Sequence, residues 1–325
     1  MARKYIMNKI KVIAVVGPTA SGKTDVGVRL AQALEGEVIC VDSRTVYKGM
    51  DIGTAKVTGE RFSRIAVGNG ELLMNDLFEA RPVMVEEVPH WGIDLVQPDE
   101  AFTAADFVEY AKKKISDISR RGKLPILVGG TGLYFRALLD GLTLTDVEAD
   151  PALRTELEAK STEDLLELLG EHDPEAASTI DEKNRRRIVR ALEIVMTTGA
   201  TLKSQQKTVE APYEVLYLGM EVEREVLFER INARVDVMIG SGLIDEARGL
   251  LDKYGAESQA MSGIGYRQLA RFFAGTLPLR EAIERIKIDS RHYAKRQLTW
   301  FKADRRIVWV KNVVQALTEA KKWLG

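Results

Sequence analysis

Short apolar runs alternate with amphipathic helical patterns over the first 140 residues of the chain. The run from Val12 to Val16 is unbroken, and similar runs precede residues 42 and 129. Between these runs, apolar residues recur at the three- and four-residue spacing of a helix with one buried face. The pattern predicts strands at residues 11–16, 37–41 and 125–128, and helices at residues 23–34, 103–121 and 133–139. Such an alternation is typical of an α/β fold, a parallel sheet with crossover helices on both faces.

The pattern becomes wholly helical after Asp150-Pro151. Four short helices are predicted there, at residues 151–159, 162–170, 173–178 and 182–198. The chain then predicts a strand at 213–222, long helices at 223–239 and 280–301, and a last strand at 306–310. We therefore expect an α/β core, residues 10–145 and 211–325, interrupted by an inserted small all-helical domain, residues 146–210. Residues 57–89 break the alternation, and the sequence does not predict their shape.

Composition excludes several classes of protein. Hydrophobic residues make up 45% of the chain, but no segment reaches the ~18 uninterrupted apolar residues of a membrane span. Polar residues soon after the basic N-terminus interrupt any signal-peptide core, so we expect a cytoplasmic protein without a membrane partner, and a monomer by default. Cys40 is the single cysteine, which excludes an intramolecular disulfide and a cysteine zinc site. Its apolar surroundings predict a buried small hydrophobe.

Opposite charges nearly cancel, with 47 basic and 48 acidic residues and a net charge of −1. Any nucleic acid must therefore bind local basic clusters. Residues 183–190 hold five cations and residues 285–306 hold eight. Either cluster alone is more often a solvated helix face, but together they indicate a polarised surface.

Residues 17–24 read Gly-Pro-Thr-Ala-Ser-Gly-Lys-Thr and follow an apolar strand. This is a complete phosphate loop, Gly-x-x-x-x-Gly-Lys-(Ser/Thr), in the strand–loop–helix context that the motif requires. Its glycines let backbone N–H groups converge on phosphate oxygens, Lys23 adds a positive charge, and Thr24 places a hydroxyl where Mg²⁺ usually binds. The loop predicts a ligand with a di- or triphosphate, without saying whether that ligand is a nucleotide.

Three further segments could carry chemistry. Asp42 ends a predicted strand beside the phosphate loop, where it would bind Mg²⁺ or activate a hydroxyl in a kinase, deprotonate another nucleophile in a different enzyme, or only cap a turn. A second glycine-rich turn, Gly129-Gly130-Thr131-Gly132, suits close approach to a ligand and tight packing equally well. Residues 262–268 suit recognition of an unstacked RNA base, or a linker between helices.

Seven segments occur in one order along the chain: residues 17–24, 42–56, 104–107, 129–142, 186–193, 265–268 and 294–301. In this order they resemble the tRNA isopentenyltransferase (tRNA dimethylallyltransferase) family, bacterial type. The run from Asp42 to Lys56 is the most specific of them. The resemblance covers the chain from residue 12 to about residue 310.

The resemblance implies transfer of a dimethylallyl group from dimethylallyl diphosphate to the exocyclic N6 amine of the adenine on the 3′ side of the anticodon in tRNA. The fold it implies is a P-loop NTPase-like core, with the phosphate loop binding the diphosphate leaving group instead of ATP. Lys23 and a magnesium ion would stabilise the negative charge that builds as the allylic C–O bond breaks. The adenine must leave its stack to reach the pocket, so a channel entered by the two substrates from opposite ends is expected.

The resemblance also assigns roles to individual residues. Asp42 is the implied general base, with Lys23 and Thr131 as the other catalytic residues, and Thr24 as the metal-binding residue. The implied diphosphate-binding residues are Gly17, Thr19, Ala20, Ser21, Gly22, Lys23, Thr24 and Arg224. The implied tRNA-binding residues are Asp42, Ser43, Arg44, Thr45, Thr131, Arg154, Arg186, Arg187, Arg190, Gly265, Tyr266 and Arg267.

Two features depart from the family pattern. Residues 57–88 are longer than in the family, and Pro89-His90-Trp91-Gly92-Ile93-Asp94 stands where the family has Pro-His-His-Leu-Ile-Asp. No zinc finger follows the last strand, which favours the bacterial type. An adenylate isopentenyltransferase acting on free AMP, ADP or ATP, a small-molecule kinase, and a non-catalytic RNA-binding protein are the alternatives. The helical insertion and the basic runs favour tRNA, since a mononucleotide needs neither.

Overall fold

The computed structural model describes residues 9–61, 66–67, 70–71, 81–142, 150–205 and 211–325. The chain divides into two compact units. Residues 1–135 and 212–325 form the first, which we call the α/β unit, and residues 136–211 form the second, the helical unit. Along the chain, the helical unit is thus inserted into the α/β unit; it spans residues 136–211, and the insertion predicted from the sequence spans residues 146–210.

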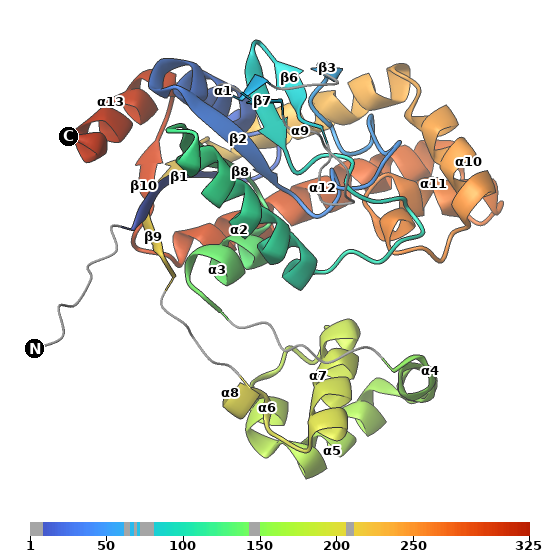
Figure 1. Ribbon diagram of the computed structural model, residues 1–325. Helices are drawn as coiled ribbons and strands as arrows, with labels where there is room; N and C mark the ends of the chain where they lie inside the picture. Colours follow the sequence, from blue (N-terminus) through green and yellow to red (C-terminus); the bar gives the residue numbers. More distant parts are fainter. Residues whose placement is uncertain (1–8, 62–65, 68–69, 72–80, 143–149, 206–210) are drawn as a thin grey trace, which may run out of the picture. The chain divides into compact units, whose positions relative to one another are not determined.

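The α/β unit is built on an eight-stranded sheet of order β10-β9-β1-β8-β2-β7-β6-β3 (Figure 1). The first six strands in this order are mutually parallel, and β6 and β3 continue the sheet antiparallel to their neighbours. The strand bounds are β1 Ile10–Val16, β2 Gly36–Val41, β3 Glu60–Arg61, β6 Val83–Val85, β7 Val88–Trp91, β8 Leu124–Gly129, β9 Tyr213–Met220 and β10 Val308–Val310; a separate hairpin pairs β4 Ala66–Val67 with β5 Gly70–Glu71.

Helices cover both faces of this sheet. The helices of the α/β unit are α1 Lys23–Leu34, α2 Ala104–Arg120, α3 Gly132–Leu139, which runs into the helical unit, α9 Arg224–Gly240, α10 Leu243–Tyr254, α11 Tyr266–Phe273, α12 Leu279–Lys302 and α13 Val313–Leu324, with a 3₁₀ turn η1 Ala260–Ser262. Ile13 and Val15 join the core beneath α1 and α13, and the intervening residues of β1 are equally buried. Successive side chains of a strand point to opposite faces, so the unbroken apolar run of β1 follows from burial on both sides.

The helical unit contains α4 Pro151–Ala159, α5 Thr162–His172, α6 Pro174–Thr179, α7 Arg185–Thr198 and α8 Leu202–Gln205. Side-chain caps set where four of them begin: Asp150, Ser161, Asp173 and Asn184 each accept a hydrogen bond from a backbone N–H of the first turn. The core lies between α4, α5 and α7 and is formed by Leu157, Leu165, Leu169, Ile188 and Leu192. This core, with no residue of the sheet in it, explains why a 76-residue insertion forms a unit of its own.

The α/β class with its parallel sheet is confirmed, and most predicted elements lie within a few residues of the observed ones. The prediction missed helices α8, α10, α11 and α13, and it missed strands β3 to β7. Of these strands, β7, β6 and β3 extend the sheet beyond β2, and β3 is its edge. The helix predicted from residue 182 begins at Arg185, because Asn184 caps it. Part of the 57–89 segment, including Gly68 and Asn69, lies outside the described residues. None of the helices in the described ranges has the length and apolar character that crossing a bilayer requires.

Candidate active site

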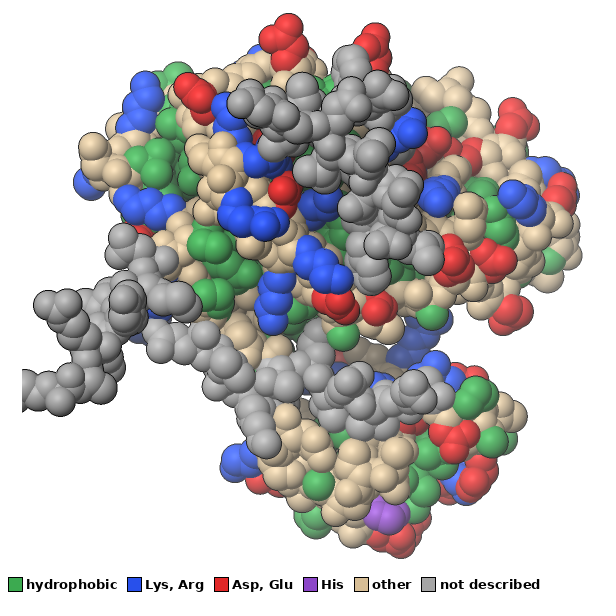
Figure 2. All heavy atoms as spheres, in the orientation of Figure 1, with side chains coloured by type: hydrophobic (Ala, Val, Ile, Leu, Met, Phe, Trp, Pro, Cys, Tyr) green, Lys and Arg blue, Asp and Glu red, His purple; other side chains and the backbone are tan. Residues whose placement is uncertain are grey.

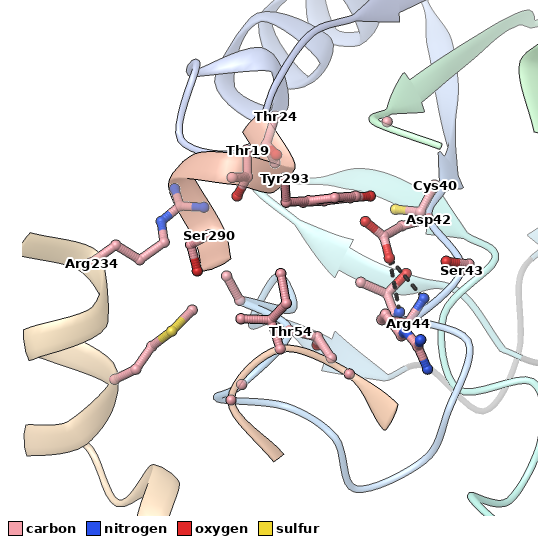
Figure 3. A pocket seen from close by; sticks show the side chains of 18 of the residues that line it. Thr19, Thr24, Cys40, Asp42, Ser43, Arg44, Thr54, Arg234, Ser290 and Tyr293 are labelled. Carbon is pink, nitrogen blue, oxygen red and sulfur yellow. Dashed lines mark hydrogen bonds between the residues drawn. The ribbon is translucent and has the colours of Figure 1, made fainter. Parts of the chain in front are cut away.

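A cavity of about 350 Å³ opens in the α/β unit, where β2 and β8 end beside the phosphate loop. The polar part of its lining comes from the phosphate loop, the end of β2 and helices α9 and α12 (Figure 3). Its apolar part includes Val38, Ile231, Val235, Met238 and Ile286. The cavity therefore has a charged end, at the phosphate loop, and an apolar wall, so one ligand with a charged and an apolar part could contact both.

The phosphate loop leaves β1 and ends at Gly22, which has the left-handed φ of +87° and caps α1. Thr19, Lys23 and Thr24 line the cavity, whereas the other predicted loop residues, Gly17, Ala20, Ser21 and Gly22, lie behind them. The Ser21 hydroxyl oxygen is buried and has no hydrogen-bond partner among the described residues. Lys23 Nζ donates to the loop's own Pro18 carbonyl at 3.0 Å. A loop with an unused hydroxyl and free N-terminal amides suits an incoming phosphate.

Positive charge accumulates in the cavity. Burial lowers the pKa of Lys23 to about 8, an effect that Asp42 opposes and Arg234 adds to. Arg234 reaches into the cavity from α9 (Figure 3), and although solvent reaches it, the surrounding protein lowers its pKa too. An anion bound beside Lys23 and Arg234 would favour the charged form of both groups.

Asp42 follows β2 and is held by its own backbone turn. Its Oδ1 accepts hydrogen bonds from the Arg44 amide at 2.7 Å and the Thr45 amide at 3.4 Å. Its Oδ2 makes no hydrogen bond to the described residues, and the half-buried side chain faces the cavity beside Tyr293 (Figure 3). The capping role weighed from the sequence thus uses one carboxylate oxygen and leaves the other open to the cavity.

The second glycine-rich turn, residues 129–132, lies beside the phosphate loop, since β1 and β8 are neighbours in the sheet. Thr131 does not line the cavity; its Oγ1 accepts a hydrogen bond from the Ser43 amide at 3.2 Å and also interacts with the Tyr293 hydroxyl. Burial and nearby Asp42 raise the pKa of Tyr293 to about 12. Thr131 therefore links α12 to the turn that carries Asp42.

The two loops are joined by Gln297 of α12, whose side chain is buried. Its Oε1 accepts a hydrogen bond from the Thr19 amide at 2.9 Å, and its Nε2 donates to the Gly130 carbonyl at 3.0 Å. A Cβ on Gly130 would lie 2.1 Å from this Nε2. The glycine there makes room for protein, not for a ligand.

Predicted tRNA-binding residues 43–45 and 265–267 meet at the cavity. Arg44 ties the two segments together by donating to the Gln259 carbonyl at 2.6 Å and to the Ser262 hydroxyl at 3.0 Å. The Thr45 hydroxyl oxygen is buried without a partner among the described residues. Arg267 Nη2 lies 2.5 Å from Asp289 Oδ2. Gly265 begins α11 with a φ of +97°.

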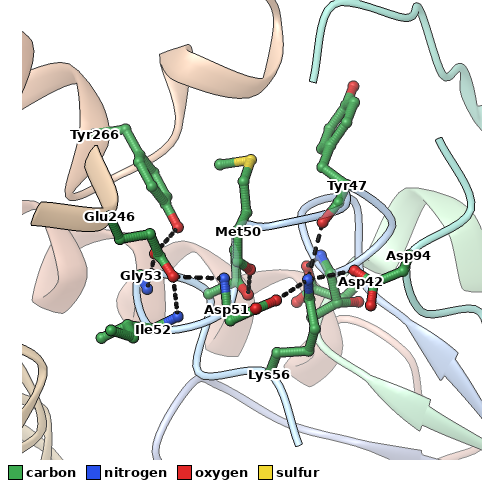
Figure 4. A network of polar contacts seen from close by, with 12 residues as sticks. Asp42, Tyr47, Met50, Asp51, Ile52, Gly53, Lys56, Asp94, Glu246 and Tyr266 are labelled. Carbon is green, nitrogen blue, oxygen red and sulfur yellow. Dashed lines mark hydrogen bonds and ion pairs between the residues drawn. The ribbon is translucent and has the colours of Figure 1, made fainter. Parts of the chain in front are cut away.

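Tyr266 is buried and supports the neighbouring loop (Figure 4). Its hydroxyl donates to Glu246 at 2.7 Å, and the same carboxylate accepts hydrogen bonds from the amides of Asp51, Ile52 and Gly53 at 2.8–3.0 Å. Lys56 Nζ donates to the Tyr47 carbonyl at 2.9 Å and forms ion pairs with Asp51 and Asp94. The family-specific run from residue 42 to 56 is therefore held in shape by polar contacts that are mostly part-buried, and sequence reasoning did not predict them.

The arginines predicted in the helical unit divide into two kinds. Arg154 and Arg190 both pair with the buried carboxylate of Glu193, at 2.6 and 3.1 Å. Arg186 and Arg187, in the first turn of α7, are exposed. On the face of the α/β unit in Figure 2, basic and acidic side chains are interspersed, so this face is not the polarised surface that the two basic clusters predicted.

Arg224, the predicted diphosphate ligand, does not line the cavity. It is the first residue of α9, and its guanidinium lies 5.2 Å from the ring centre of Phe228. Arg234, almost three turns later on the same helix, does line the cavity. Sequence reasoning missed Arg234, Tyr293 and Gln297. The periodicity of a helix shows which residues share a face, but it does not show which residues along that face lie next to the cavity.

Comparison with known proteins assigns the chain to a family. A family model described as IPP transferase matches residues 79–304, more than half of the chain. The chain belongs to the IPP transferase family. The tRNA dimethylallyltransferase of Halalkalibacterium halodurans is 43% identical over 308 residues, 93% of this chain and 91% of that one. The Bacillus subtilis tRNA dimethylallyltransferase is 40% identical over 326 residues, covering 97% and 96%.

Solved structures show the same family likeness. The crystal structure of a tRNA isopentenylpyrophosphate transferase from Bacillus halodurans has a TM-score of 0.68 and 40% identity, over 97% of this chain and 96% of that one. A eukaryotic dimethylallyltransferase acting on tRNA has a TM-score of 0.71 and 28% identity, over 97% of this chain and 77% of that one. The resemblance drawn from the sequence is confirmed.

Proposed function

We propose that this family member transfers a dimethylallyl group from dimethylallyl diphosphate to the N6 amine of the adenosine on the 3′ side of the anticodon in tRNA. A C–N bond forms, the allylic C–O bond breaks, diphosphate leaves with the electron pair, and the amine proton goes to Asp42. The observation that carries the proposal is a single cavity that contains the phosphate-loop Lys23, the carboxylate of Asp42 and an apolar wall.

The diphosphate binds at the ionic end of the cavity. Lys23 at the start of α1 and Arg234 on α9 both supply positive charge. The backbone amides at the start of α1 supply hydrogen-bond donors. Donors fixed before the reaction stabilise the charge that develops on the leaving oxygen without reorganising.

The five-carbon chain lies against the apolar wall of Val38, Ile231, Val235, Met238 and Ile286. These side chains come from β2, α9 and α12, so they are fixed by the fold. An apolar wall excludes water from the allylic carbon, which protects a cationic transition state from hydrolysis. A nucleotide kinase would instead need hydrogen-bonding groups for a base and a ribose at this place.

Asp42 accepts the amine proton through Oδ2, while Oδ1 is held by two backbone amides. A carboxylate is a weak base, but it suffices here because the nitrogen becomes strongly acidic only as it bonds to carbon. Thr131 fixes the position of the Asp42 turn through the Ser43 amide, and Tyr293 contacts Thr131 from the cavity side. Thr131, which directly precedes α3, thus shapes the part of the pocket that receives the target nucleotide by holding the Asp42 turn in place.

The residues present fit a magnesium ion that is held chiefly by the diphosphate. Thr24 lines the cavity with its hydroxyl, and the described residues contain no cluster of three or more acidic, histidine or cysteine side chains that would form a cage. Mg²⁺ prefers such a site, with few protein ligands and several phosphate or water oxygens. When bound, the ion neutralises the leaving group.

RNA binds with residues 43–45 and 263–267 at the mouth of the cavity. Ser43 and Thr45 line the cavity next to Asp42, and the glycines at 263 and 265 let an RNA backbone approach. In the helical unit, exposed Arg186 and Arg187 are the phosphate contacts. Arg154 and Arg190 add positive charge while they hold Glu193.

The test is incubation with dimethylallyl diphosphate, Mg²⁺ and either unmodified tRNA or AMP, followed by mass analysis of the adenine. Prenylated tRNA supports the proposal; prenylated AMP alone indicates an adenylate isopentenyltransferase, and ATP turnover without prenylation indicates a kinase. Asp42→Ala should retain tRNA binding and lose about 10²–10⁴-fold in turnover. Full activity of that variant would overturn the assignment of the base.

Two arginines on α9 provide a matched pair for the diphosphate site. Arg234→Ala should raise the KM for dimethylallyl diphosphate by tenfold or more, at about 1.4 kcal/mol per tenfold change, since it removes a cation from the cavity. Arg224→Ala removes the same charge from the start of the same helix, outside the cavity, and should change that KM less than twofold. The reverse ranking would restore the role first predicted for Arg224.

A further inference from the structure

A large aromatic side chain is exposed one helical repeat away from the cavity. Trp300 is 46% exposed, and the neighbouring Leu133 is 42% exposed. Tyr293 and Gln297, which line the cavity, precede Trp300 by seven and three residues on α12. Residues at this spacing share one face of a helix, so that face runs from the cavity to the indole. Seven residues correspond to about 10 Å of helix.

The indole is seated on a glycine. A Cβ on Gly132 would lie 2.3 Å from both Cδ1 and Nε1 of Trp300, so the ring edge rests against the start of α3. Thr131, the residue before Gly132, accepts the hydrogen bond from Ser43 in the Asp42 turn. Leu133 follows directly and extends the apolar surface. One edge of the ring therefore packs against the turn that supports Asp42, while the rest of the side chain stays exposed.

The surroundings of Trp300 are basic. Arg296, one turn earlier on the same face, lines the cavity and lies over the ring of Tyr293, 5.8 Å from its centre. Lys295 and Lys302 are exposed on the same helix. Within the described part of the chain, none of these three cations has an acidic partner within salt-bridge distance. An exposed aromatic next to unpaired cations is the combination that binds single-stranded nucleic acid.

We propose that Trp300, with Leu133, is a stacking platform for the unpaired base next to the target adenosine. The inference rests on the proposed function and adds a positioning residue to it. When the adenine leaves its stack to enter the cavity, its neighbour loses a stacking partner. Trp300 supplies a replacement π-face at the place where the RNA leaves the cavity, and Arg296 faces the phosphate between the two nucleotides.

The first test compares Trp300→Ala with Trp300→Phe, using an anticodon stem-loop as substrate. Stacking energies of single bases predict a rise of about 5- to 100-fold in the KM for RNA in the alanine variant. Trp300→Phe keeps a ring and should stay within about threefold. The KM for dimethylallyl diphosphate should be unchanged in both, which also shows that the fold is intact. Val314→Ala, at a more exposed apolar residue on α13, is the matched control.

The second test removes the base instead of the indole. Stem-loops that lack the base on the 5′ or the 3′ side of the target adenosine are assayed with wild type and Trp300→Ala, as a double-mutant cycle. If the platform exists, one of the two abasic substrates is weakened in wild type, and Trp300→Ala weakens it no further. A penalty for Trp300→Ala that persists with both abasic substrates, or an RNA KM within twofold of wild type, overturns the proposal. A wild-type enzyme that prenylates no RNA would instead contradict the proposed function.

Discussion

Two glycine-rich turns lie side by side in this protein and serve opposite purposes. The phosphate loop connects β1 to α1, and residues 129–132 connect the neighbouring β8 to α3. At the helix end of the phosphate loop, a Cβ on Gly22 would meet nothing within 4 Å, and the Ser21 hydroxyl is without a partner in the described residues. At its strand end the loop is tighter, since a Cβ on Gly17 would lie 2.9 Å from Ser21 Oγ. In the second turn, Cβ atoms on Gly129, Gly130 and Gly132 would lie 2.0–2.3 Å from Val41, Gln297 and Trp300.

The difference shows that a glycine pattern reports close approach without saying what approaches. The phosphate loop leaves room for a ligand. In the turn at residues 129–132, the space next to the glycines is occupied by the Val41 carbonyl and by two side chains of α12, Gln297 and Trp300. Those side chains lie some 170 residues further along the chain, as the separation of 167 between Gln297 and Gly130 shows. The predictions below test the contrast between an open loop and a filled one.

The largest effect is expected at Lys23. Lys23→Ala should lower kcat by about 10²–10³-fold, because it removes a fixed charge from the leaving group. The pKa of Lys23 is about 8 in the fold against 10.5 for the free side chain, so the buried ammonium opposes folding at pH 7. The free energy of unfolding should therefore not fall, in contrast to a change in the filled turn. Lys48→Ala, at an exposed lysine, is the control.

Gly129→Ala should show the opposite behaviour, a loss of stability. The added Cβ would lie 2.0 Å from the Val41 carbonyl oxygen, and backbone on both strands must move. We expect the free energy of unfolding to fall by about 1–3 kcal/mol, as for other overpacked sites. Urea denaturation measures it. The control Gly249→Ala, on α10 with nothing within 4 Å, should be neutral or slightly stabilising; equal effects would mean that the second turn is not filled.

Gln297→Ala tests the connection between the two turns. It leaves the Thr19 amide and the Gly130 carbonyl without their partner, at a cost of about 1–3 kcal/mol. Because Thr19 lies in the phosphate loop, the KM for dimethylallyl diphosphate should rise as well. Gln32→Ala, which loses two exposed hydrogen bonds, one with Arg29 and one with the Glu86 carbonyl, should change neither quantity. Loss of stability without a change in the KM for dimethylallyl diphosphate would show that the Gln297 link does not affect diphosphate binding.

The smallest effect is the pH dependence of diphosphate binding. Lys23, with a pKa of about 8 in the free protein, is increasingly neutral above that pH. A diphosphate favours the ammonium, so binding takes up a proton, and the affinity should fall by up to about tenfold per pH unit above 8. Burial keeps the pKa of Cys40 and Tyr293 near 12, so these groups do not titrate in this range. Isothermal titration of Lys23→Ala should show no such slope.

The sequence by itself determined the α/β class, the phosphate loop, the helical insertion and the family. These follow from local rules: hydrophobic period, capping residues and a loop whose spacing is set by the phosphate it binds. Asp42 could also be placed, because parallel strands end on one edge of their sheet and Asp42 directly follows the last residue of β2.

Only the tertiary structure decided which of the remaining candidates face the cavity. Arg224 and Arg234 share a helix, and packing of α9 turns the second one to the phosphate loop. Thr131, Arg44 and Tyr266 looked like ligand-binding residues and are engaged by Ser43, Gln259 and Glu246. The physical reason is that a buried polar group needs a hydrogen-bond partner, and that partner can come from a distant part of the chain. The residues next to it in the sequence therefore do not identify the partner.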